Sequence, residues 1–171
     1  MVAPVELIVD DEIVLRLYTL EDADVIFDLI DRNRDHLNQF GEGTSDKYLT
    51  RESVVESLVD PPKPEKLRYG IWVNDTYVGT VNLTPYAIKQ AEVGCYLGQE
   101  FQRHGYMTRS VNCLVDSAIN EMGFEFGVVA EVHIDNTASR SVLERCGFHQ
   151  LTNGEVLEHL FYGKGELPLG E

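Results

Sequence analysis

Apolar residues recur at helical spacing in the second half of the chain. Starting at Val111, six of them fall at i, i+3, i+4, i+7, i+8 and i+11. This spacing places them on one face of an α-helix, with polar residues on the other. We therefore expect a strongly amphipathic helix over residues 107–122. The six residues are Val111, Leu114, Val115, Ala118, Ile119 and Met122.

Two helices are expected in the first third of the chain. Thr19 can cap the first helix, with Asp22 at the reciprocal capping position. Thr50 can cap the second, which should end before the proline-rich segment 60–66 because proline cannot continue a helix. Between them, residues 35–49 are polar and are expected to form a turn-containing loop.

Period-two patterns and turn residues predict strands in most of the remaining chain. Asp135 or Asn136 can cap one further short helix, and Gly147 fits the left-handed position after its end. The order is then two strands, two helices, three strands, the long helix, a strand, the short helix and two strands. We expect one α+β domain over residues 1–171, with the early helices on a mixed sheet. The expected strands lie within residues 6–17, 67–73, 77–86, 92–98, 127–134, 147–152 and 155–163.

The composition is acidic, with 14 Lys and Arg against 29 Asp and Glu and a net charge of −15. General binding to nucleic acid is disfavoured, because it needs a cationic face. No apolar run approaches membrane-spanning length, and the N-terminus lacks a signal-peptide pattern. Three widely spaced cysteines, Cys95, Cys113 and Cys146, favour reduced thiols in a cytoplasmic protein over a disulfide framework.

One turn departs from this acidity. Residues 98–110 carry Arg103, His104 and Arg109, and no acid occurs between Glu100 and Asp116. The turn joins an expected strand to the start of the long helix, where unpaired amides and the helix dipole favour an anion. A phosphate or pyrophosphate site is one interpretation, and an ordinary surface loop is the other.

The surrounding sequence resembles the GNAT superfamily of N-acetyltransferases, and within it the RimJ/RimL-like protein N-acetyltransferases. The superfamily's [RQ]-x-x-G-x-[GA] loop corresponds to residues 102–107, and the preceding EVGCYLG is similar to its fourth strand. An N-x-x-S motif follows at Asn136 and Ser139, ending in Gly147–Phe148. The resemblance implies the GNAT fold, with a mixed, mostly antiparallel sheet that splays between the family's fourth and fifth strands.

The resemblance also implies an acetyl-CoA-dependent N-acetyltransferase. The loop amides would hold the CoA pyrophosphate, Asn136 would contact the pantetheine arm, and amides near Tyr96 and Leu97 would receive the acyl group. Met107 departs from the usual Gly or Ala of the loop, which puts the fit of the pyrophosphate in question. The implied CoA-binding residues are Tyr96, Leu97, Gln102, Arg103, His104, Gly105, Tyr106, Met107, Thr108 and Asn136.

The catalytic assignments are less direct. Many superfamily members have a tyrosine seven residues after the asparagine, where this chain has Leu143, so Ser139 is the expected general acid. Glu92, at the head of its strand, is the candidate general base. The residues left open as alternatives are Glu131, Glu155 and Glu158, and His133 is expected to pack beside a strand. No HExxH or CxxC motif occurs, so we expect no metal.

The acceptor is expected to be a cationic amine, first of all the N-terminal amine of a ribosomal-type protein. In this family the N-terminal helices line the acceptor side, and residues 1–60 hold 15 acids and 5 bases, a net charge of −10. A solvated, solubilising surface is the alternative explanation of that charge. Two other functions remain open: acetylation of a small amine, such as a polyamine or antibiotic, and a non-catalytic CoA-binding sensor. No membrane or nucleic-acid partner is expected, and a homodimer is compatible with this interpretation.

Overall fold

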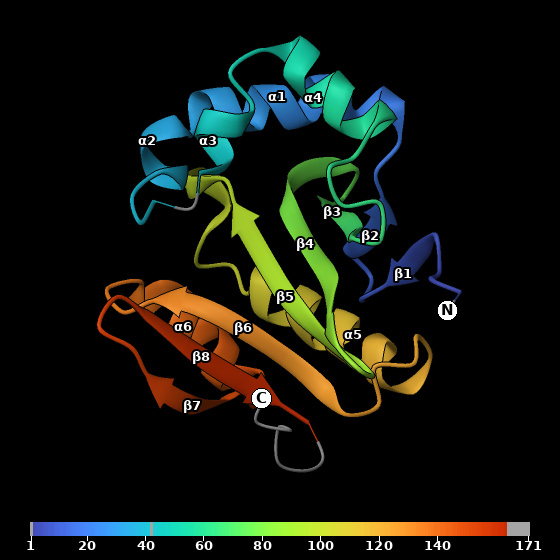
Figure 1. Ribbon diagram of the computed structural model, residues 1–171. Coiled ribbons are helices and arrows are strands. Elements are labelled where there is room, and N and C mark those ends of the chain that lie inside the picture. Colours follow the sequence, from blue (N-terminus) through green and yellow to red (C-terminus); the bar gives the residue numbers. More distant parts are fainter. Residues whose placement is uncertain (1, 42, 164–171) are drawn as a thin grey trace.

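A computed structural model of the protein describes residues 2–41 and 43–163, with only the backbone of Thr152 and Asn153. Its centre is a sheet in the order β1-β2-β3-β4-β5-β6-β8-β7 (Figure 1). All neighbouring strands are antiparallel except β5 and β6, which are parallel. The strands are β1 (Glu6–Ile8), β2 (Ile13–Leu17), β3 (Leu67–Val73), β4 (Thr76–Ala87), β5 (Gln90–Leu97), β6 (Gly127–His133), β7 (His149–Asn153) and β8 (Leu157–Tyr162).

The expected helices are present, with their expected caps. The Thr19–Asp22 capping box precedes the first helix. At the start of the helix that begins at Arg51, the Thr50 side chain accepts a hydrogen bond from the Ser53 amide. The segment 35–49 differs from the expected loop because it contains most of one short helix and all of another. The helices are α1 (Ala23–Arg32), α2 (Arg34–Leu37), α3 (Thr44–Lys47), α4 (Arg51–Val59), α5 (Tyr106–Asn120) and α6 (Thr137–Arg145), with 3₁₀ turns at Leu20–Asp22 and Gln99–Phe101.

Arg34 explains why the polar segment folds. Its guanidinium donates hydrogen bonds to the Ser45 carbonyl at 2.9 Å and to the Tyr48 carbonyl at 3.1 Å. These bonds fix α3 against the end of α1, and a helix of one turn needs such tertiary support because nucleation is unfavourable. Local sequence patterns alone do not encode this contact.

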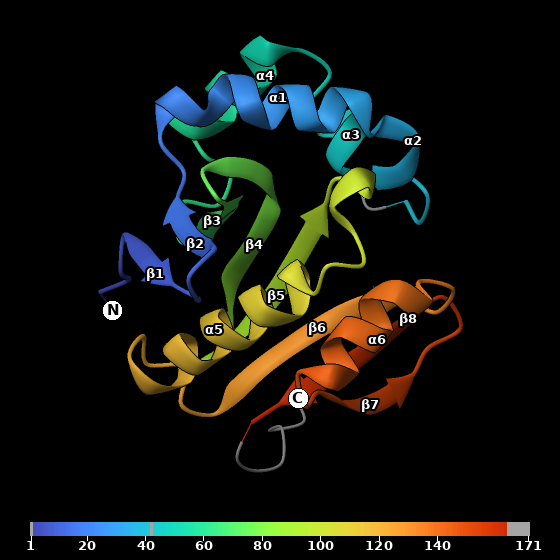
Figure 2. The same ribbon diagram turned by 180° about the vertical axis from the view of Figure 1, so that it is seen from behind.

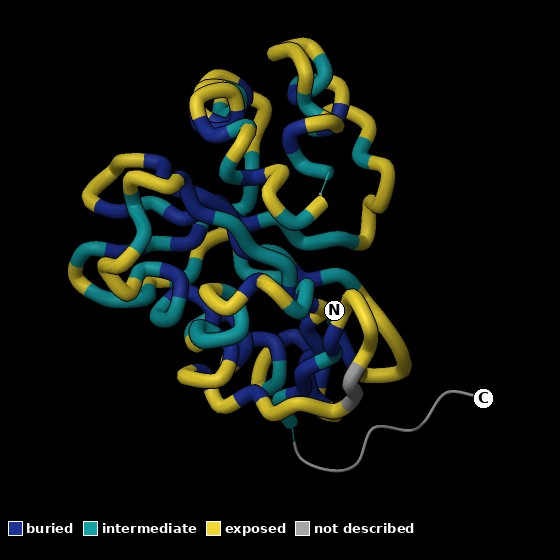
Figure 3. The backbone as a smooth tube through the Cα atoms, turned by 90° about the vertical axis from the view of Figure 1, so that its left-hand side faces the viewer, coloured by how far each residue is buried: buried dark blue, intermediate teal, exposed yellow. Residues whose placement is uncertain are grey.

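The two faces of the sheet carry separate hydrophobic clusters. Helix α5 packs on one face with its apolar stripe, including the fully buried Val111 and Leu114, and α6 lies on the same side (Figure 2). Helices α1 and α4 cover the other face with Ile26, Leu29 and Val54. Figure 3 shows exposed residues on the outer turns of helices and loops, and buried residues along the sheet.

Strands β5 and β6 separate along their length, which confirms the expected splay. Their ladder consists of three pairs in the described part of the chain, ending at Glu92 with Val129. Beyond that point β5 continues to Leu97 beside β4, and β6 continues to His133 beside β8. The backbone therefore divides the sheet into two halves that part toward α2 (Figure 1).

Candidate active site

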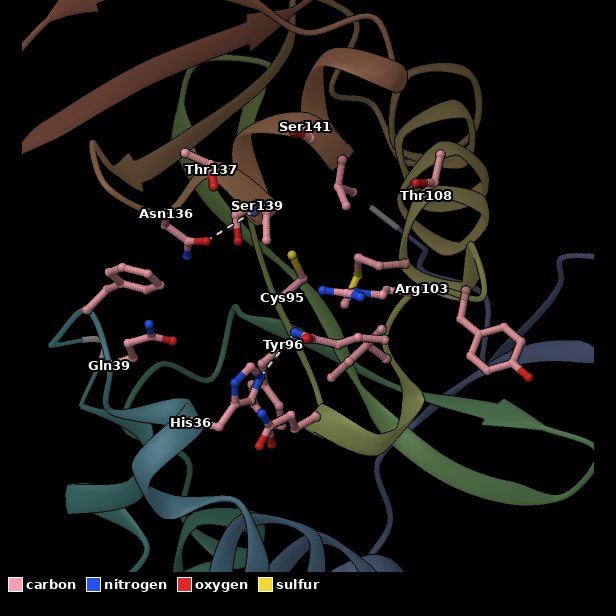
Figure 4. A pocket seen from close by; sticks show the side chains of 18 of the residues that line it. His36, Gln39, Cys95, Tyr96, Arg103, Thr108, Asn136, Thr137, Ser139 and Ser141 are labelled. Atoms are coloured by element: carbon pink, nitrogen blue, oxygen red, sulfur yellow. Dashed lines mark hydrogen bonds between the residues drawn. The ribbon is translucent and has the colours of Figure 1, made fainter.

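A cavity of about 790 Å³ lies where the two halves of the sheet part. Its walls come from α2, β5, the loop before α5, the first turn of α5, and α6 (Figure 4). This volume is typical of a site for a drug-sized or cofactor-sized ligand. The predicted site residues that line the cavity are Tyr96, Leu97, Gln102, Arg103, Gly105, Tyr106, Met107, Thr108, Asn136 and Ser139.

The loop before α5 has an unusual backbone conformation. Gly105 is the N-cap of α5 with φ = 73°, and Arg103 also has a positive φ of 66°. A glycine adopts the left-handed conformation without a steric penalty, whereas other residues pay for it. The turn directs the first amides of a 15-residue helix to the cavity side, so it can receive an anionic group.

Met107 is accommodated without displacing this loop. It is only 7% exposed and belongs to the hydrophobic cluster under α5. A large side chain at this position therefore contributes to the core, and only part of it reaches the cavity wall. Its departure from the family pattern does not obstruct the turn.

The exposed edge of β5 supplies backbone donors. The Gly98 amide donates to the Val78 carbonyl of β4 at 3.0 Å. Because backbone groups of successive strand residues point to alternate sides, the Cys95 and Leu97 amides point away from β4, into the parted sheet. Both residues line the cavity.

Helix α6 brings polar groups to the opposite wall. The Asn136 side-chain oxygen accepts the Ser139 amide at 3.1 Å, as an N-cap does. This bond fixes the first turn of α6 and leaves the Ser139 hydroxyl on the cavity side (Figure 4). Thr137 and Ser141 also line this wall, and the sequence analysis did not single them out.

Three residues that the sequence analysis had in view lie elsewhere. His104 does not line the cavity: its ring stacks on Tyr106 with centroids 5.1 Å apart. Arg109, expected to add charge to the turn, instead pairs with Asp10 at 2.6 Å and Glu12 at 2.9 Å. Glu92 lines neither this cavity nor the smaller one described below, although it occupies the last paired position before the strands diverge.

Two of the three alternative acids have structural partners. Glu158 is buried and pairs with Arg140 of α6, and Glu131 lies 3.3 Å from the His159 ring. Glu155 is an exposed residue of the turn before β8. None of the three lines the cavity, as is also true of Glu92, so the cavity lining does not choose among these acids.

Helix α2 and the residues after it contribute a wall that the sequence analysis missed. His36 Nε2 lies 3.1 Å from the Gln102 side-chain nitrogen, and Gln39 faces the cavity beside it (Figure 4). Phe40 contacts His133 with ring centroids 5.5 Å apart. This pair joins the two halves of the sheet at the open end of the cleft. A local sequence pattern could not predict the contact, because Phe40 and His133 lie 93 residues apart.

A tyrosine cluster lies on the other face of β5. The Tyr18 and Tyr77 hydroxyls are 2.6 Å apart, and those of Tyr77 and Tyr96 are 3.5 Å apart. Burial raises the pKa of Tyr77 and of Tyr96 well above the ordinary tyrosine range. The three hydroxyls therefore act as neutral hydrogen-bonding groups near neutral pH.

Of the acids in residues 1–60 that the structure describes, none lines either of these two cavities. Several are used elsewhere: Asp22 caps a helix, Asp24 pairs with Arg51, and Asp10 pairs with Arg109. The expectation that their charge rims the acceptor site is therefore not supported by where the acids lie. Their placement agrees better with a solvated outer surface.

Comparisons with known proteins agree with this fold and site. Residues 12–149 match the family model described as "Acetyltransferase (GNAT) domain". The chain is 31% identical over 147 residues to "Probable N-acetyltransferase YjcK" of Bacillus subtilis (strain 168), covering 81% of each chain.

Two solved structures share the fold. The first is the Microcin C7 self immunity acetyltransferase MccE in complex with acetyl-CoA and AMP, with a TM-score of 0.79, 23% identity, and coverage of 91% of this chain and 94% of that one. The second is RimL, a ribosomal L7/L12 alpha-N-protein acetyltransferase in complex with CoA, with a TM-score of 0.81, 17% identity, and coverage of 92% and 97%.

A splayed mixed sheet with an amide-lined turn beside the gap defines an acyltransferase fold. Together with these matches, it shows that the chain belongs to the GNAT acetyltransferase family and is an acetyl-CoA-dependent acyltransferase. Within the described residues, no helix has the length and apolar character to cross a membrane, and no three His, Cys, Asp or Glu side chains gather as metal ligands would.

Proposed function

We propose that this enzyme transfers the acetyl group of acetyl-CoA to the N-terminal amine of a protein. The observation that carries the proposal is the continuity of one cavity from the turn before α5 into the gap between β5 and β6. The turn offers amides for an anion, and the gap offers a strand edge for an extended arm. The likeness to RimL supports a protein terminus as the acceptor.

The chain's own groups fit the acyl donor. The α5 amides from Tyr106 onward, with Arg103 beside them, would hold the pyrophosphate. The outward amides of Cys95 and Leu97 would bind the arm and the thioester carbonyl oxygen, where they would stabilise negative charge developing during attack. Bound acetyl-CoA supplies an activated acyl carbon.

Two proton transfers accompany the reaction, since the attacking ammonium must lose a proton and the leaving thiolate must gain one. Ser139 would donate to the thiolate, because its hydroxyl lies on the cavity wall at the first turn of α6. Glu92 would accept the amine proton through intervening water, because it lies at the closed end of the gap and outside the cavity wall.

Thiol release from acetyl-CoA would test the proposal. The acceptors would be a peptide with a free N-terminus, the same peptide N-terminally formylated with its lysine side chains intact, and a panel of polyamines and aminoglycosides. We expect turnover with the free peptide and its loss on formylation, with the acetyl group located by mass spectrometry. Turnover confined to small amines would contradict the protein acceptor. Tight CoA binding without turnover of any amine would contradict catalysis.

A further inference from the structure

A second, smaller cavity lies on the opposite face of β5. It has a volume of about 90 Å³ and lies beneath α1, α3 and α4, against β3 and β4. Tyr96 lines both this cavity and the large one, so the two cavities border the same residue of β5. A group bound here would therefore lie next to the region where the acyl group is transferred.

Three basic side chains line this cavity: Lys47 of α3, Lys66 before β3, and Arg68 of β3. No carboxylate of the described residues is among its lining. The ion pairs formed within the described chain use other basic residues. In a chain of net charge −15, this is a local concentration of positive charge without matching acids.

The surroundings hold these charges without neutralising them. Arg68 donates to the Ser57 carbonyl at 2.7 Å and lies 5.8 Å from the centroid of the Tyr18 ring, and both partners are uncharged. Burial and then the positive charges of Lys47, Lys63 and Arg68 lower the pKa of Lys66, while Glu92 opposes them with the smallest effect. Lys66 and Arg68 are half-buried, whereas Lys47 is exposed. Half-buried like charges destabilise a fold, so an anionic ligand is the arrangement that would satisfy them.

We propose that the acceptor carries a carboxylate or phosphate close to its reactive amine, and that Lys47, Lys66 and Arg68 bind this anion. The inference rests on the proposed acetyl transfer and specifies its substrate class. For a protein acceptor, the anion is the side chain of an Asp or Glu in the first few residues. The enzyme then selects an acidic N-terminal sequence, in contrast to the cationic acceptor expected from the acidic composition.

The size of the cavity sets the size of the group. About 90 Å³ is well below the roughly 150 Å³ of a protein cavity that holds a benzene ring. A carboxylate or a phosphate fits this space, whereas an aromatic ring or a nucleotide does not. Asn82 and Tyr48 line the same cavity and can add neutral hydrogen bonds to the bound oxygens.

Matched peptides that differ only at the second residue would test the proposal. We would measure kcat/KM for peptides with Asp, Asn or Lys at that position and a free N-terminus. A charged hydrogen bond predicts a preference for Asp over Asn of about tenfold, and Lys should be the poorest. Lys66→Gln and Arg68→Gln should each reduce the Asp-to-Asn ratio toward one. Lys63→Gln is the control, because Lys63 is exposed and does not line the cavity.

The outcomes separate this proposal from the proposed function. The anion site would be overturned if all three peptides were acetylated with equal kcat/KM. It would also be overturned if the preference for Asp were unchanged in both Gln variants. Either result would leave N-terminal acetylation standing. If no peptide reacts, phosphoethanolamine would be compared with ethanolamine. A preference for phosphoethanolamine that Lys66→Gln removes would support the anion site with a small-molecule acceptor, and equal rates or no reaction would overturn it. Thermal unfolding of both Gln variants would check that each is folded, since Arg68 also bonds Ser57.

Discussion

The two faces of β5 border cavities that are built in different ways. On the Cys95 face, one turn and the starts of two helices bring backbone amides to a large, open cleft. On the Tyr96 face, side chains from α3, β3, β4 and β5 surround a small pocket. In the proposed function, the first cavity holds the acyl donor and the second binds part of the acceptor. On that proposal, donor binding follows from local backbone geometry, whereas acceptor choice depends on side chains far apart in sequence.

Replacement of Ser139 should have the largest effect on the donor face. Ser139→Ala removes the hydroxyl but keeps the backbone amide, which donates its hydrogen bond to the Asn136 side chain. Helix α6 should therefore stay capped. If Ser139 protonates the leaving thiolate, kcat should fall about 100-fold, as expected for loss of a general acid. The KM for acetyl-CoA should change little.

Ser141→Ala is the matched control, because Ser141 also lines the cavity from α6. Its kcat should fall by less than about twofold. Equal kcat values for the wild-type enzyme and Ser139→Ala would remove Ser139 as the acid, and the donor face would then contribute binding alone.

Two glycines at opposite ends of α5 allow a test of the amide-lined turn. Gly105 and Gly123 both have left-handed backbones, with φ of 73° and 86°, and an added Cβ meets nothing closer than 3.9 Å at either position. Alanine at either site should cost about 1–2 kcal/mol of unfolding free energy, from backbone strain alone.

Only Gly105→Ala should also weaken donor binding, because only that turn borders the cavity. We expect the KM for acetyl-CoA to rise about tenfold in Gly105→Ala and to stay unchanged in Gly123→Ala. Urea unfolding would report the shared stability loss. Equal KM values in the two variants would argue against the turn as the pyrophosphate site.

Arg103 and Arg109 should differ in effect although both lie near the turn. Arg103 lines the cavity, whereas the guanidinium of Arg109 is occupied by Asp10 and Glu12. Arg103→Gln should raise the KM for acetyl-CoA by about threefold at low salt, and less at high salt because exposed charges are screened. Arg109→Gln should raise this KM less than Arg103→Gln does, because Arg109 does not line the cavity and reaches the turn only through hydrogen bonds to the Gly105 and His104 carbonyls. A larger rise than in Arg103→Gln would reverse their assigned roles.

The sequence predicted what depends on neighbouring residues. The caps Thr19, Thr50 and Asn136 and the left-handed Gly147 lie close in sequence to the helix ends that they serve, so local patterns predicted them. The family resemblance added the splay of the sheet, which ends pairing at Glu92.

The sequence did not reveal contacts made across long separations. Arg109 meets Asp10 and Glu12, 97 or more residues away, so a basic residue near the turn had seemed available to a phosphate. The cavity lined by Lys47, Lys66 and Arg68 combines residues of α3, of the loop before β3 and of β3 itself, about 20 residues apart in the chain. Net charge averages over the surface, so it does not predict that three basic side chains face this cavity.

The smallest expected effect concerns the contact that keeps Arg109 out of the donor site. Burial disfavours the charged form of Asp10, but hydrogen bonds from the Glu12 amide, Arg109 and the Ile13 amide outweigh it and lower the pKa of Asp10 below its ordinary 3.8. A carboxyl group with a lowered pKa in the folded state stabilises the fold above its unfolded pKa, and this contribution is lost as pH falls through the folded value.

Asp10→Asn keeps a side-chain oxygen that can accept the hydrogen bonds of the Glu12 and Ile13 amides, and it removes the negative charge. We expect it to lower the unfolding free energy by at most about 1 kcal/mol at pH 7, because the pair is partly exposed and screened. The difference from the wild-type protein should be the same at pH 5 and should shrink as the pH falls below about 3.8, where the Asp10 carboxylate takes up its proton. Urea unfolding at pH 7, 5 and 3 would measure it, with Asp11→Asn at the exposed neighbouring position as control. A difference that persists undiminished at pH 3 would show that the charge of Asp10 does not contribute, and that Arg109 is held by Glu12 instead.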